Sequence, residues 1–102
     1  MKIIETLSDK INEELDDARS YAKLAIDEKS EHRGLAEALM SLSNDEMRHS
    51  MVLHNEVAKL IEEYRKANGE PPAEMMAVYK YLHGKSIEKA ERVKRLQQMY
   101  NG

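Results

Sequence analysis

Apolar residues recur at steps of three and four between Leu35 and Ile61, and this period constrains the fold more than any other feature. At helical spacing, seven positions fall on one stripe, and five of them are leucine: Leu35, Leu39, Leu42, Glu46, His49, Leu53 and Leu60. A stripe so rich in leucine predicts a helix that turns this face to a core. A carboxylate and an imidazole stand in its middle, and burying a charge without a partner is costly.

Glu46 and His49 are three residues apart, so both side chains reach one spot on a helix. Glu-x-x-His on an inward helix face is the half-site with which four-helix bundles hold a pair of iron or manganese ions. The motif alone is weak, because fourteen glutamates and four histidines can produce such a spacing by chance. A satisfied core histidine beside a glutamate that reaches outward gives the same pattern.

A second apolar stripe precedes this helix and predicts another one over residues 3–29. Glu14 lies inside that stripe, between Ile11 and Ala18, while the neighbouring acidic residues fall on the polar side. Residues 29–34 contain turn-forming residues and no apolar period, so they predict a connection.

The short connection makes the first helix and the second, over residues 34–67, an antiparallel hairpin. Glu14 precedes the turn by about as many residues as Glu46 and His49 follow it, so all three lie roughly 25 Å from the turn. The sequence therefore predicts two carboxylates and one imidazole at one level of the hairpin. A buried hydrogen-bonded network, or a slightly rotated helix that exposes Glu14, remains open as an alternative.

The donor types indicate which metal fits. The chain has no cysteine, which excludes disulfides, zinc-thiolate sites and thiol catalysis. Carboxylate oxygen and imidazole nitrogen suit iron or manganese. A closed zinc site usually recruits more Cys or His.

The remaining residues predict a third helix. Asn68-Gly69 followed by Pro71-Pro72 is a helix stop, and a helix over residues 73–100 follows, which Gly84 is expected to kink or split. The expected fold is all-α, with a long antiparallel helical hairpin plus a C-terminal helix, in a single domain over residues 1–102.

Three further histidines are set aside. His32 falls in the connection and is expected to be exposed, and His54 is expected at the surface or flank of its helix. His83, beside Gly84, is expected at a surface or an interface.

Charge and hydropathy argue against several partners. The net charge is −3 with both signs mixed along the chain, so no basic block predicts nucleic-acid binding. No apolar run approaches membrane-spanning length. The N-terminus becomes acidic too early for a signal peptide, so the expected compartment is the cytoplasm.

Glu14, followed 32 residues later by Glu46-Met47-Arg48-His49, resembles one half of the ferritin-like di-iron bundle of rubrerythrins and ferritins. Tyr21 stands where rubrerythrin-type proteins carry a tyrosine near the metal centre. The resemblance covers roughly residues 3–64. It implies that Glu46 bridges two metals and that Glu14 and His49 are terminal ligands. Tyr21 either hydrogen-bonds a ligand or is a core tyrosine.

The family fold has two such helix pairs, and this chain has one Glu-x-x-His. The resemblance therefore implies a homodimer that completes the four-helix bundle and shares two iron or manganese ions. Encapsulated ferritins, which this arrangement resembles, are short chains that usually dock into an encapsulin shell through a C-terminal peptide. Residues 97–102 show no such peptide.

The function implied by the resemblance is that of a ferroxidase or peroxidase-type di-iron oxidoreductase. Two alternatives stand beside it. One is a non-enzymatic helical interaction module whose polar residues set the register of packing. The other is a degenerate ferritin-like scaffold that keeps the fold and binds metal poorly.

Overall fold

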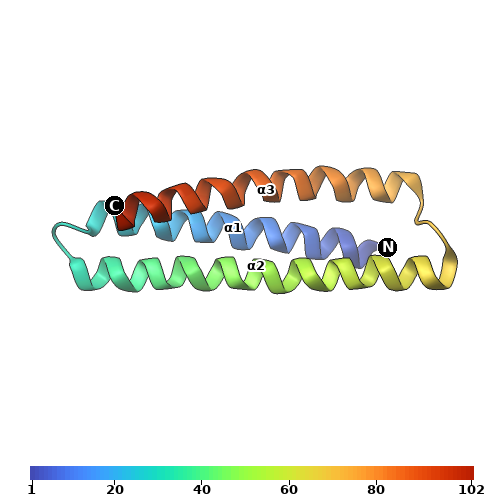
Figure 1. The fold of residues 1–102 in the computed structure, drawn as a ribbon, viewed down its shortest axis with the longest axis horizontal. Helices are drawn as coiled ribbons and strands as arrows, with labels where there is room; N and C mark the ends of the chain where they lie inside the picture. The colour runs from blue at the N-terminus through green and yellow to red at the C-terminus, as the bar shows by residue number, and fades with distance from the viewer.

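Three long helices joined by two short connections make up the computed structural model, which describes all residues from 1 to 102. They are α1 (Lys2–Glu28), α2 (Arg33–Asn68) and α3 (Ala73–Asn101). α2 runs antiparallel to the other two, so α1 and α3 are parallel (Figure 1). The molecule is a rod of 56 × 19 × 18 Å, and α1 contacts both other helices along its length.

The helix ends follow local signals. At the end of α2, Gly69 has φ 80°, a left-handed conformation that glycine adopts readily, and its N–H donates to the Arg65 carbonyl. Arg65 and Lys66 place positive charge in the last turn of α2, where the helix dipole favours it. Pro71 and Pro72 then end the connection, and α3 begins at the next residue.

The predicted all-α fold, a hairpin followed by a C-terminal helix, is confirmed, and each predicted helix end lies within about one residue of the observed one. Gly84 does not split α3, which is one continuous helix. None of the helices carries an apolar stretch long enough to cross a membrane.

The core divides along the rod into two parts. One half holds larger side chains from α1 and α2, and they are Ile4, Ile11, Leu15, Val57 and Ile61. The other half is lined by alanines, including Ala18, Ala22 and Ala25, which are fully buried. Small side chains let α1 and α2 approach closely there, and the Ser43 hydroxyl donates to the Ala18 carbonyl at 2.7 Å.

The stripe of leucines on α2 departs from its prediction. Leu35 and Leu42 are 52% and 42% exposed, so the expectation that they face the core of the chain is wrong. α2 instead buries a neighbouring stripe, which consists of Ala36, Met40, Ser43, Ser50, Val57 and Ile61. The core side of α2 is therefore rotated away from Leu35 and Leu42, while Leu39, Leu53 and Leu60 are half-buried and pack against the core. Glu46 and His49 lie at the edge of that core.

Candidate metal centre

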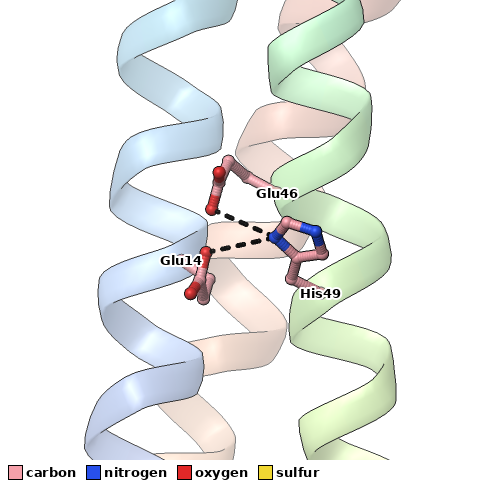
Figure 2. A group of neighbouring side chains, drawn as sticks. All are labelled: Glu14, Glu46 and His49. Carbon is pink, nitrogen blue, oxygen red and sulfur yellow. Dashed lines mark ion pairs between the residues drawn. The ribbon is translucent and has the colours of Figure 1, made fainter.

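The α1–α2 hairpin brings Glu14, Glu46 and His49 together, as their equal distance from the turn predicts. Glu14 extends from α1, and Glu46 and His49 extend from successive turns of α2 (Figure 2). One ligand atom from each residue lies within 4.8 Å of the other two. The residues therefore form a cluster with two carboxylates and one imidazole.

The distances inside the cluster leave room for an ion. His49 Nδ1 lies 3.7 Å from Glu46 Oε2 and 3.8 Å from Glu14 Oε2. Both distances are too long for a good hydrogen bond. Two ligands that share one ion at about 2.1 Å are roughly 3–4 Å apart. The separations thus fit a common cation better than a directly hydrogen-bonded network.

The charges in the cluster are poorly compensated by the protein. No lysine or arginine forms an ion pair with Glu14 or Glu46, and His49 is their only partner. The side chains of Glu46 and Glu14 are only 18% and 26% exposed. Two half-buried carboxylates without a lysine or arginine partner could hold a divalent metal ion.

The cluster opens on the side of the hairpin that α3 leaves uncovered. In Figure 2 the ribbon of α3 passes behind α1 and α2, and the three side chains lie in front. His49 is 46% exposed, and no residue of α3 belongs to the group. With three ligand residues from one chain and one open side, the cluster can accept further ligands from outside the chain.

Tyr21 lies two helical turns beyond Glu14 on α1, a distance of about 10 Å along the axis. Its side chain is half-buried and makes no hydrogen bond to Glu14, Glu46 or His49. The predicted role of Tyr21 beside the metal stays a prediction.

A stack of rings between α2 and α3 was not expected from the sequence. His54 stacks on His83 with ring centroids 5.1 Å apart, and Tyr79 stacks on the same ring at 5.6 Å. His54 is therefore not a simple surface residue. Burial, and to a lesser degree the nearby His54, lower the pKa of His83. No local sequence signal reveals this stack, because it depends on how α3 packs.

Comparison of the chain with known protein families, with curated proteins and with solved structures finds no match in any of the three.

Proposed function

We propose that two copies of this chain pair through the open side of the hairpin and share a di-iron centre that oxidises Fe(II). The observation that carries the proposal is the convergence of Glu14, Glu46 and His49 within 4.8 Å. Donor type, spacing and missing countercharge all fit a divalent cation of the iron or manganese kind.

The dimer follows from what the single chain lacks. One copy supplies two carboxylates and one imidazole, and a two-fold pair supplies four carboxylates and two imidazoles. That is the ligand set of the di-iron carboxylate bundles. The exposed Leu35 and Leu42 lie on the same stripe as Glu46, so a second copy would cover them while it completes the site.

Each residue then has a role. Glu46 is the most covered of the three, which suits a carboxylate that bridges two ions at the centre of the interface. Glu14 and His49 are terminal ligands, one from each helix. Tyr21 lies on the same side of α1 as Glu14 and is the candidate to hydrogen-bond a terminal ligand.

When bound, an iron pair supplies two electrons, which with two protons reduce dioxygen to hydrogen peroxide or hydrogen peroxide to two waters. The protein holds the ligand geometry and covers the carboxylates from water. The chain has no cysteine, so any thiolate-ligated electron carrier belongs to another protein.

The test is iron content after anaerobic loading with Fe(II) and desalting, with the mass in solution read on the same samples. We expect about one iron per chain, which is two per dimer. Glu46→Ala and His49→Ala should both lose the iron. Glu13→Ala and His32→Ala are matched controls, because Glu13 adjoins Glu14 but is 63% exposed, and His32 is 61% exposed.

A parent chain that retains no iron would contradict the proposal, as would equal loss in the control variants. A dimer that forms without metal, and whose stability Fe(II) does not change, would favour the second candidate. That candidate is a helical interaction module, and the exposed leucines of α2 are the observation in its favour.

A further inference from the structure

A groove between α1 and α3 is lined by positively charged side chains that pair with no acidic residue of the chain. Its volume is about 240 Å³, and its lining consists of Arg19, Lys23, Arg92, Arg95, Leu96 and Met99. Four of these six residues are cationic and none is acidic. We call this lining the cation groove.

The cations of the groove have no partners within the chain. None of the four forms an ion pair, although the chain as a whole carries a net charge of −3. Like charges that converge without a counterion repel each other and weaken the fold. Their presence in one groove therefore needs a reason beyond solubility.

In the turn that precedes the cation groove, α1 and α3 form an ion pair between opposite charges. One turn before the cation groove, Lys89 on α3 pairs with Asp16 on α1 at 3.0 Å. One turn later, Arg92 takes the place of Lys89, and the facing position on α1 is Arg19 in place of an acid. The contact between the two parallel helices thus changes from opposite charges to like charges over a single turn.

We propose that the cation groove binds a linear, multivalent phosphate such as tripolyphosphate. Three arginines supply planar donor forks that match phosphate oxygens, and Lys23 adds a fourth positive charge. The cations stand in two pairs, one on each wall, and each pair extends over about one helical turn, or 5.4 Å. A short chain of phosphates fits such a slot and meets both walls at once.

The number of charges favours several linked phosphates over one. A single orthophosphate carries about two negative charges at neutral pH and cannot balance four cations. A linked chain brings more negative charge into the groove and contacts more donors. Leu96 and Met99 complete the lining with apolar side chains. The lining therefore has no acceptor side chain that would compete with phosphate oxygens for the arginine and lysine donors.

The experiment is calorimetric titration of the metal-free full chain with tripolyphosphate and, separately, with orthophosphate and a short single-stranded oligonucleotide. We expect one tripolyphosphate per chain, and markedly weaker binding of the other two. Arg92→Glu and Arg19→Glu should each weaken binding of tripolyphosphate about tenfold or more. Lys80→Glu is the matched control, because Lys80 is an exposed lysine of α3 outside the groove.

Equal weakening by Lys80→Glu would overturn the proposal, since it would show attraction to overall charge. Tighter binding of the oligonucleotide would also overturn it and would make the groove a nucleic-acid surface. Glu14→Gln should bind tripolyphosphate as the parent does, which separates this result from the metal centre. The two substituted side chains of the groove, Arg19 and Arg92, are exposed, and circular dichroism checks that the helices persist.

Discussion

The two contacts that α1 makes differ in kind. Toward α2 it packs Ile4, Ile11 and Leu15 against buried aliphatic side chains. On the α3 side, half-buried apolar residues such as Tyr79 and Ala90 pack against this core, and polar contacts lie beside them. The Asn12 amide donates to the Leu82 carbonyl at 3.3 Å, and Asp16 pairs with Lys89. Nearly all the buried apolar residues belong to α1 and α2, and α3 supplies only Val93, so the hairpin contributes more to the hydrophobic core than α3 does.

Each contact also carries a concentration of one charge at its edge. Glu14 and Glu46 stand between α1 and α2, and the cation groove stands between α1 and α3. Arg19 and Lys23 are about 140° and 180° around α1 from Glu14, so the two charge clusters occupy opposite sides of one helix. Repulsion within each cluster lowers the free energy of unfolding of the chain without a ligand. Binding sites commonly lose stability in this way in exchange for function.

The largest effect should come from the apolar contact. Leu15 is 2% exposed and belongs to the core cluster between α1 and α2. Leu15→Ala should lower the free energy of unfolding by about 2–5 kcal/mol, because it removes buried methyl groups and leaves a cavity. Urea denaturation measures it. A loss no larger than that of a surface variant would contradict the conclusion that the α1–α2 contact contributes most to the stability of the fold.

The cluster of Glu14, Glu46 and His49 should show a smaller effect of opposite sign. Glu14→Gln removes one of two neighbouring carboxylates that lack a lysine or arginine partner. In metal-free protein, the free energy of unfolding should therefore rise by about 0.5–1 kcal/mol, while iron binding is lost. Thermal unfolding with and without Fe(II) measures both. Destabilisation of the metal-free chain would instead mean that the carboxylate is part of a structural network.

The ring stack should give the α2–α3 side a pH dependence. The folded chain holds the pKa of His83 below its ordinary value of 6.5, so the unfolded chain binds more protons in the window just below 6.5. The free energy of unfolding therefore falls as the pH drops through that window. His83→Gln should remove this part of the dependence, as measured by urea denaturation from pH 7.5 to 5, roughly the window where histidine titrates.

His32→Gln is the matched control for that series, because His32 is an exposed histidine. This variant should retain the loss of stability that the lowered pKa of His83 causes. If the two variants gave the same curve, the lowered pKa of His83 would contribute nothing to the dependence of stability on pH.

The smallest effect should come from the ion pair between α1 and α3. Lys89→Ala removes the partner of Asp16, which is itself 60% exposed. Solvent screens such a pair, so the free energy of unfolding should change by no more than about 0.5–1 kcal/mol. The measurement is the same denaturation, repeated at high salt. A loss as large as that of Leu15→Ala would show that α3 is held as firmly as α2.

Much of the fold could be predicted because its signals are local. Gly69 ends α2, and α3 begins directly after the two prolines that follow. The short connection between α1 and α2 makes those two helices an antiparallel hairpin. The level of Glu14 with Glu46 and His49 follows from residue counting along two antiparallel helices. The stripe of leucines misled at Leu35 and Leu42, because helical periodicity identifies an apolar face without showing which structure covers it.

The sequence by itself determined the three helices, the hairpin and the convergence of Glu14, Glu46 and His49, since each depends on spacing along the chain. Only the tertiary structure decided on which side of the hairpin α3 lies. That choice leaves Leu35, Leu42 and the candidate metal site open, stacks His54 on His83, and aligns Arg19 and Lys23 with Arg92 and Arg95. The physical reason is that α3 spreads its apolar residues over more than one face, so its side is decided by packing against α1 and not by its own periodicity.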